Sequence, residues 1–230
     1  MFNKKYLFTA CIIALCGLGS SSASALDFHM SRYSLESFVA TPYINSLHMV
    51  SADTKAKELS KSEEFIDIMG KKAISFLSDS SLSQDQKRNR FQSLLKKNYD
   101  MKTIGRFALG KNWSLASDSQ KSEYLKLFEK MVVDVYSKRF DEYKGQRFEV
   151  RSSRDIGKND KLVNTVILPD SGPEVDVDWR VRDKNGKQQI IDVVIEGVSM
   201  SLTQRSDFSS VIQRGGGGSI EPLLDHLRNR

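Results

Sequence analysis

The sequence predicts an α+β fold in which helices cover one face of a curved antiparallel sheet of roughly four strands. Two changes in hydrophobic spacing predict it. Between residues 62 and 145, apolar residues recur at three- and four-residue steps, the period of amphipathic helices. Between residues 148 and 198 they alternate with polar and charged residues, the period of strands. Helical spacing returns after Met200, so helices precede and follow one strand meander.

Capping residues predict where the helices before the sheet begin. Ser83 with Gln86, and Ser117 with Gln120, form the Ser-x-x-Gln pattern of a capping box. Asp100 can cap a short helix between these two, and Gly110 then stops it. The helix that begins after Ser117 carries the strongest apolar stripe of the chain, formed by Tyr124, Leu127, Phe128, Met131, Val132 and Val135.

Four strand-like segments follow. The first carries Phe148 and Val150, and the second spans residues 162–168. The third, residues 175–181, alternates valines and Trp179 with Asp and Arg, so one of its faces is apolar. Asn185-Gly186 then predicts a tight hairpin turn into the fourth strand, residues 189–198.

The two ends of the chain carry their own signals. At the start, Lys4 and Lys5 precede an apolar run over residues 6–18 and an Ala-Ser-Ala that ends at Ala25. This pattern predicts a secretory signal peptide cleaved after Ala25, since the run is too short to span a membrane. Acylation of Cys16 is the alternative, although Leu15 does not suit it. At the other end, residues 215–218 are all glycine and break the last helical stretch, after which Ser219 can cap a final helix.

The predicted domains are therefore a signal peptide over residues 1–25, an N-terminal arm over 26–61 and one domain over 62–230. Both cysteines, Cys11 and Cys16, leave with the signal, so the mature chain can form no disulfide and no thiolate metal site. The net charge of +6 falls by two, and mild basicity suits an anionic membrane surface or an acidic partner. Scattered basic residues without interleaved aromatics disfavour nucleic acid as a partner.

The search for catalytic or cofactor chemistry finds no strong motif. His29, His48 and His226 are far apart, and no phosphate loop, dinucleotide fingerprint or G-x-S-x-G is present. Asp176 and Asp178 lie about 7 Å apart on one strand face, a spacing that acid–base hydrolysis can use. Their alternation with arginines favours a solvated face of paired charges instead. We therefore predict no enzyme, no cofactor and no metal.

Three segments resemble the MlaC / toluene-tolerance auxiliary family, the periplasmic lipid-binding components of an ABC transport system in Gram-negative bacteria. They are residues 104–113 (IGRFALGKNW), 175–181 (VDVDWRV) and 191–200, whose D-V-V-I-E-G-V-S run is the most specific part. The resemblance covers roughly residues 65–228. The chain departs from it at Ile191, where the family often has an aromatic residue, and in the glycine-rich run at residues 215–218.

The resemblance implies a strongly curved sheet and helices that enclose a hydrophobic pocket for acyl chains. It implies a carrier that shuttles phospholipid between an outer-membrane lipoprotein complex and an inner-membrane MCE-protein/ABC transporter. A hopanoid-like cargo is open, because a sister branch is associated with hopanoids. The candidate lining residues lie on the apolar strand faces, on the best helical stripe and in the family-like segments: Phe107, Met131, Val135, Val175, Val177, Trp179, Ile191, Val193, Ile195, Val198 and Met200. Each of them can equally be ordinary core.

Two other classes of protein stay open. One is an enzyme on a similar cone-shaped α+β scaffold, with Asp192 or Glu196 as its buried carboxylate. Glu196 has a structural alternative, since it precedes Gly197 and can cap a backbone bend. The other is an adaptor that binds only envelope proteins, through a solid core and a large exposed patch.

Overall fold

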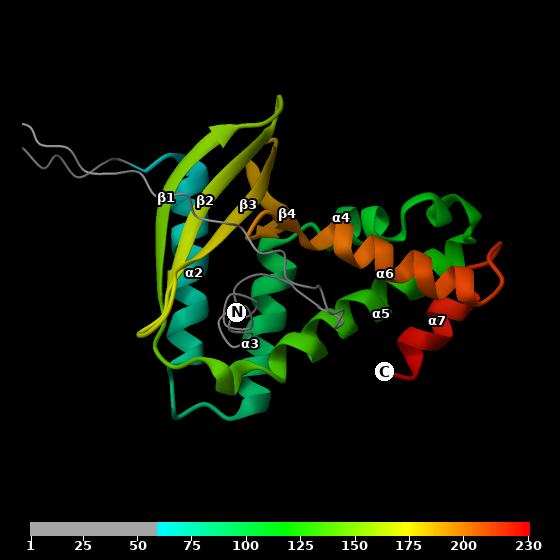
Figure 1. Ribbon diagram of the computed structural model, residues 1–230, viewed down its shortest axis with the longest axis horizontal. Helices are drawn as coiled ribbons and strands as arrows, with labels where there is room; N and C mark the ends of the chain where they lie inside the picture. Colours follow the sequence, from blue (N-terminus) through cyan, green and yellow to red (C-terminus); the bar gives the residue numbers. More distant parts are fainter. Residues whose placement is uncertain (1–58) are drawn as a thin grey trace, which may run out of the picture. The chain divides into compact units, whose positions relative to one another are not determined.

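The computed structural model describes residues 59–230 (Figure 1). The predicted signal peptide, its cleavage site after Ala25 and almost all of the predicted arm lie outside the described residues. Among the described helices, none combines the length and the apolar composition needed to cross a membrane.

Helices α2 (Lys61–Leu77) and α3 (Gln84–Asn98) pack together and against the sheet (Figure 1). The capping box of Ser83 and Gln86 is confirmed at the start of α3. A second capping box, of Ser60 with Glu63, begins α2. Gly70 lets α2 approach strand β1 closely, because a Cβ there would lie 2.5 Å from the ring of Phe148.

Three further elements lead to the sheet: α4 (Met101–Leu109), the 3₁₀ helix η1 (Gly110–Leu115) and α5 (Asp118–Ser137). The predicted caps at Asp100 and Ser117 are confirmed, and α4 ends at Gly110, whose φ of 59° lies in the left-handed region. The backbone N–H of Asp100 donates to the carbonyl of Ile190, which ties the start of α4 to the sheet. A short 3₁₀ helix, η2 (Phe140–Glu142), follows α5.

The sheet is antiparallel throughout, in the order β1-β2-β3-β4-β5. Its strands are β1 (Arg147–Asp155), β2 (Asp160–Leu168), β3 (Val175–Lys184), β4 (Lys187–Ile195) and β5 (Val198–Ser199). The four predicted strands are confirmed, as is the hairpin turn, where Asn185 and Gly186 have φ values of 55° and 80°. The fourth strand was predicted to run to Val198, but β4 ends at Ile195. Glu196 and Gly197, with φ values of 49° and 77°, turn the chain so that β5 pairs back on β4. The strong curvature of the sheet stays a prediction.

Two helices complete the unit, α6 (Met200–Arg214) and α7 (Glu221–Arg228). Helix α6 packs on α4, and Phe208 meets the rings of Tyr124 and Phe128 of α5 at centroid distances of 5.9 and 6.0 Å. The structural N-cap position of α7 is Ile220, one residue after the predicted Ser219, and it makes no side-chain cap hydrogen bond. The Ser219 hydroxyl nevertheless accepts from the N–H of Glu221, the first residue of α7. Pro222, the second residue of α7, has no N–H, so Glu221 supplies the donor that the Ser219 hydroxyl accepts.

Strand register decides which residues of the sheet face the helices. The core face of β2, β3 and β4 carries Val163, Thr165, Ile167, Val177, Trp179, Val181, Ile190, Val193 and Ile195, all buried. The other face carries the charged residues of β3. Its arginines do not pair with their neighbours Asp176 and Asp178. Arg180 and Arg182 both donate to Asp160 of β2, at 2.8 and 2.7 Å.

Asp160→Asn is expected to lower the free energy of unfolding by about 1–2 kcal/mol at pH 7, because charge-assisted hydrogen bonds are lost while half-exposed arginines can turn to water. Hydrogen bonds from Arg182 and, less strongly, Arg180 hold the pKa of Asp160 below its ordinary value, against the opposing effect of burial. A lowered pKa stabilises the fold above the unfolded-state value of about 3.9, and this contribution is lost as the pH falls through the folded-state value. Urea unfolding of both proteins at pH 7 and pH 3 checks this. A difference that does not shrink at pH 3 would contradict it.

Candidate functional site

The largest group of predicted lining residues gathers on the core face of the sheet. Val177 lies opposite Ile195, and Trp179 lies opposite Val193, in cross-strand pairs. All four are at most 4 % exposed, and Val175 is buried at the start of the same strand. The sequence placed Val175, Val177 and Trp179 on one strand face and Val193 and Ile195 on another. The strand register brings these two faces together as one buried apolar surface.

Trp179 is the largest side chain of this surface and is fully buried. Its indole N–H donates to the hydroxyl of Thr165 at 2.9 Å, and that hydroxyl donates to the carbonyl of Val177 at 2.8 Å. Phe148 meets the indole edge to face, with ring centroids 6.4 Å apart. Because the indole N–H and the Thr165 hydroxyl are both hydrogen-bonded within the sheet, this surface is apolar and needs no polar group of a ligand as a partner.

Ile191 is displaced from this regular pattern. The register shifts between Arg180 and Val181, so that Val181 lies opposite Ile190 while Arg180 lies opposite Asp192. Ile191 is the extra residue of a β-bulge. It is buried, but Ile190 takes the position opposite Val181 that simple alternation would have given to Ile191.

The two lining residues predicted on α5 border a cavity between α5 and α7, which we call the α5–α7 cavity. Met131 and Val135, together with Leu227 of α7, give it an apolar wall, and its volume is about 510 Å³. Such a volume is within the range of small-molecule sites. Its remaining walls are charged, formed by Lys130, Asp134, Lys138, Arg139, Glu142 and Arg230. Sequence analysis assigned none of these charged residues to the site, and it also missed Leu227, although the spacing of Leu223, Leu224 and Leu227 marks an apolar face of α7.

The charges around this cavity are only partly neutralised. Asp134 accepts from Lys130 and forms an ion pair with Arg88. Burial raises the pKa of Asp134, but these two partners together hold it below its ordinary value, so the carboxylate stays ionised. Lys138 and Arg230 take part in no ion pair within the part of the chain that the structure describes. The cavity thus joins an apolar wall to a rim with two available cations, which suits an anionic amphipathic ligand.

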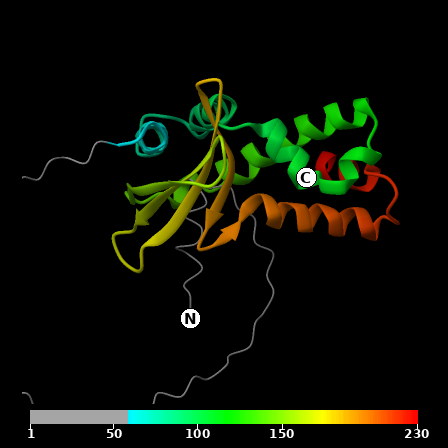
Figure 2. The same ribbon diagram turned by 90° about the horizontal axis from the view of Figure 1, so that it is seen from above.

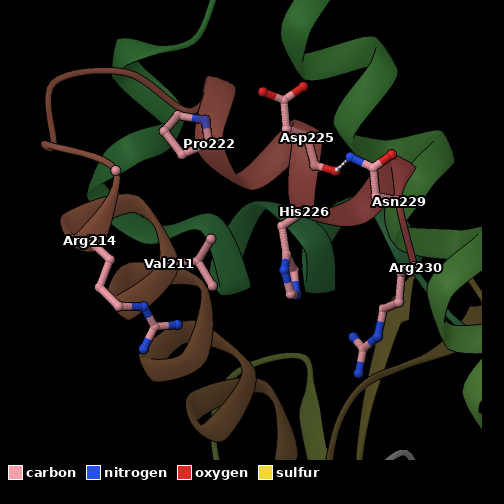
Figure 3. Close-up of a pocket in the computed structure, with 8 residues that line it drawn as sticks. Val211, Arg214, Pro222, Asp225, His226, Asn229 and Arg230 are labelled. Carbon is pink, nitrogen blue, oxygen red and sulfur yellow. Dashed lines mark hydrogen bonds between the residues drawn. The ribbon is translucent and has the colours of Figure 1, made fainter.

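A second cavity, of about 590 Å³, lies between α6 and α7 (Figure 3). Arg214, His226 and Arg230 extend into the same space, and the side-chain amide of Asn229 donates to the carbonyl of Asp225. His226 is exposed in the last turn of α7, and over residues 59–230 no three metal-binding side chains come together. With Val211 and Pro222 as its apolar members, this cavity offers little surface for an acyl chain.

Three predicted lining residues lie elsewhere. Met200 is buried at the start of α6, whereas Phe107 on α4 and Val198 on β5 are 41 % and 50 % exposed. The guanidinium carbon of Arg205 sits 5.4 Å from the centre of the Phe107 ring. The family-like segments therefore contribute to an outer surface as well as to the interior.

The carboxylates considered for catalysis make local structural contacts. Glu196 has a φ of 49° and accepts from the backbone N–H of Asp176 at 2.7 Å, so it caps the bend before Gly197. Asp192 accepts from the hydroxyl of Ser199 at 2.6 Å and from the N–H of Ser201 at 3.1 Å. Asp178 accepts from the amide of Asn164. These bonds give each carboxylate a role in holding the backbone.

Asp192→Ala is therefore expected to lower the free energy of unfolding by about 1–2 kcal/mol, because the start of α6 loses two hydrogen bonds. The lipid content of the purified protein should not change. Urea unfolding and native mass spectrometry measure the two quantities. Unchanged stability together with an altered bound small molecule would instead favour the enzyme reading.

The fold and the site together define a small α+β binding protein, with an apolar interior surface and a cationic cavity rim. The family model described as MlaC protein matches residues 68–229, and the chain belongs to this family. The intermembrane phospholipid transport system binding protein MlaC of Haemophilus influenzae is 22 % identical over 133 residues. That alignment covers 56 % of this chain and 61 % of the relative, so the chain spans about three fifths of the length of that relative.

A solved structure gives an independent comparison of the fold. The phospholipid-binding protein from Ralstonia solanacearum, determined in complex with a phospholipid, matches with a TM-score of 0.63 at 19 % identity. The match covers 74 % of this chain and 96 % of that protein. At this level of identity, the comparison shows that the two chains share a fold.

Proposed function

We propose that this protein is a periplasmic carrier that buries the acyl chains of a phospholipid and moves the lipid between the two membranes of the envelope. The observation that carries the proposal is the apolar wall of Met131, Val135 and Leu227 beside a cationic rim, in a chain that belongs to the MlaC family. The names of the Haemophilus and Ralstonia relatives, which refer to phospholipid transport and binding, support the same cargo.

The physical need for such a carrier follows from the cost of exposing a lipid to water. A diacyl phospholipid has about thirty methylenes, and at about 0.8 kcal/mol each their exposure costs on the order of 20 kcal/mol. A carrier must therefore bury both chains, while the headgroup can stay hydrated. This requirement is met by apolar surface and needs no catalytic group, so the protein acts by binding alone.

The position of the lipid follows from the same surfaces. We place an acyl chain against the apolar wall formed by Met131 and Val135 of α5 and Leu227 of α7. A further part of the lining on the sheet, at Val177, Trp179 and Ile195, is also proposed, and it requires the packing of these buried side chains to open around the lipid. Met131 suits this position because its flexible side chain adapts to chains of different shape. The phosphate then lies at the rim, within reach of Lys138 and Arg230.

The remaining parts of the proposal concern the route. The signal-like start of the sequence supports export with cleavage after Ala25. An outer-membrane lipoprotein complex and an inner-membrane MCE-protein/ABC transporter are the proposed donor and acceptor, on the basis of the family. A hopanoid is the alternative cargo, and it differs from a phospholipid in mass and in lacking the phosphate.

Native mass spectrometry of the mature protein tests this function. The protein is expressed with its own signal, purified from the periplasm without detergent and measured before and after lipid extraction. A stoichiometric phospholipid that survives washing is the expected result. A bound lipid with the mass of a hopanoid would instead identify a hopanoid as the cargo. A lipid-free protein that also takes up no lipid from added vesicles would contradict the carrier function and favour an adaptor that binds only envelope proteins.

A further inference from the structure

Large apolar side chains remain exposed where β5, α4 and α6 meet. Phe107, Val198 and Leu202 are 41 %, 50 % and 53 % exposed. Helices α4 and α6 lie side by side (Figures 1 and 2), and the guanidinium of Arg205 on α6 covers the ring of Phe107 on α4. Leu202 and Arg205 are about one helical turn apart, and Val198 lies just before Ser199, the N-cap of α6. With the exposed Arg106 beside Phe107, these five residues form what we call the α4–α6 face.

The cations of this face are held in place by packing. A Cβ at Gly110 would lie 2.7 Å from Nε of Arg205, so the absence of a side chain at Gly110 makes room for this guanidinium. The guanidinium carbon of Arg106 lies 5.9 Å from the centre of the Trp113 ring. The contacts of Arg205 with Phe107 and of Arg106 with Trp113 are cation–π interactions, which hold an arginine without neutralising its charge.

No acidic group balances these arginines. Residues 101–116 contain three cations and no carboxylate, and Asp207 is the only carboxylate of α6. Within residues 59–230, neither Arg106 nor Arg205 forms an ion pair. Arg228 of α7 shows the contrast, since it binds Glu123, Glu221 and Asp225. The α4–α6 face is thus both apolar and positively charged.

We propose that the α4–α6 face docks the protein onto the surface of an anionic phospholipid bilayer. Exposed Phe and Leu side chains flanked by Arg are the composition that enters the boundary between headgroups and acyl chains. Each cation near an anionic leaflet adds to the attraction. The inference deepens the proposed lipid-carrier function and rests on it, because a carrier of lipid gains from holding its site close to the membrane that supplies or receives the cargo. Charge complementarity with phosphate headgroups selects the bilayer as the partner.

Vesicle sedimentation tests the proposal. Wild-type protein is mixed with vesicles of phosphatidylglycerol and phosphatidylethanolamine, and separately with vesicles of phosphatidylcholine alone, at low and high salt. The test variant combines Arg106→Gln with Leu202→Gln. The matched control combines Lys72→Gln with Ile68→Gln on α2, since Ile68 is also exposed, at 58 %. Native mass spectrometry of all three proteins records the lipid that they carry.

Wild type and control are expected to bind the anionic vesicles and to be released by salt, whereas the test variant should bind at least about tenfold more weakly. All three should carry the same lipid. Equal binding of the test variant and the control, or no binding of the wild type, would overturn the proposal. A test variant that binds vesicles normally but loses contact with an acidic envelope protein would also overturn it, in favour of a protein partner. A lipid-free wild type would count against the carrier function alone, since the vesicle measurement is read separately.

Discussion

Trp179→Ala is expected to lower the free energy of unfolding by about 3–5 kcal/mol, the largest loss that we anticipate for a single side chain of this domain. The indole is fully buried, packs on Phe148 and donates to Thr165. Its removal leaves a void at the centre of the sheet, and the Thr165 hydroxyl loses the hydrogen bond that it accepts from the indole N–H. Denaturant unfolding, followed by circular dichroism, measures the change.

Two controls make this measurement specific. Trp179→Phe keeps most of the apolar volume, so it should cost much less than Trp179→Ala and should report the lost hydrogen bond together with the smaller ring. Each protein has to be compared in the same lipid state, since a bound lipid stabilises the folded form by mass action. A loss below about 1 kcal/mol for Trp179→Ala in lipid-free protein would contradict the tight packing of the sheet face.

Val135→Asn is expected to reduce the phospholipid that co-purifies with the protein by about tenfold. Val135 is half-buried on the wall of the α5–α7 cavity, where an amide side chain would face acyl methylenes without a hydrogen-bond partner. Burying an unsatisfied amide costs about 1–3 kcal/mol in proteins, which corresponds to a loss of affinity of roughly 5-fold to 150-fold. Native mass spectrometry and quantitative lipid extraction give the occupancy.

Ile68→Asn is the matched control for Val135→Asn, because it makes the same polar change at an exposed apolar position on α2. It should leave lipid occupancy unchanged. Both variants should unfold cooperatively, so that a loss of lipid cannot be ascribed to a loss of fold. Equal occupancy in Val135→Asn and wild type would remove the α5–α7 cavity from the proposed acyl-chain site.

The sequence correctly predicted the helix caps and the turn that depend on residues close together in the chain. The capping boxes at Ser83 and Ser117 and the cap at Asp100 were predicted correctly, because each involves hydrogen bonds within four residues. The Asn185-Gly186 turn is equally local, since both residues tolerate the positive φ that it requires. The start of α7 was predicted one residue too early, since the N-cap position is Ile220, although the Ser219 hydroxyl accepts from the N–H of Glu221.

The candidate site was predicted where it depends on alternation along one strand. Val177 and Trp179 share a face in any antiparallel sheet, and their burial follows from that face being apolar. Ile191 was assigned by the same rule, but the bulge opposite Val181 gives the regular position to Ile190. A bulge depends on the pairing of two strands, and alternation along a single strand carries no signal of it.

By itself, the sequence determined the helix starts at Ser83, Asp100 and Ser117, the strand alternation and the family, because these depend on neighbouring residues and on short ordered motifs. Tertiary structure alone decided that Leu227, Lys138 and Arg230 border one cavity with Met131, and that Arg205 lies on Phe107 at an outer face. Helix α7 is far from α5 in the chain, and α6 is far from α4, so these contacts exist only once α7 has packed on α5 and α6 on α4. Non-local packing of this kind leaves no periodicity in the sequence to be read.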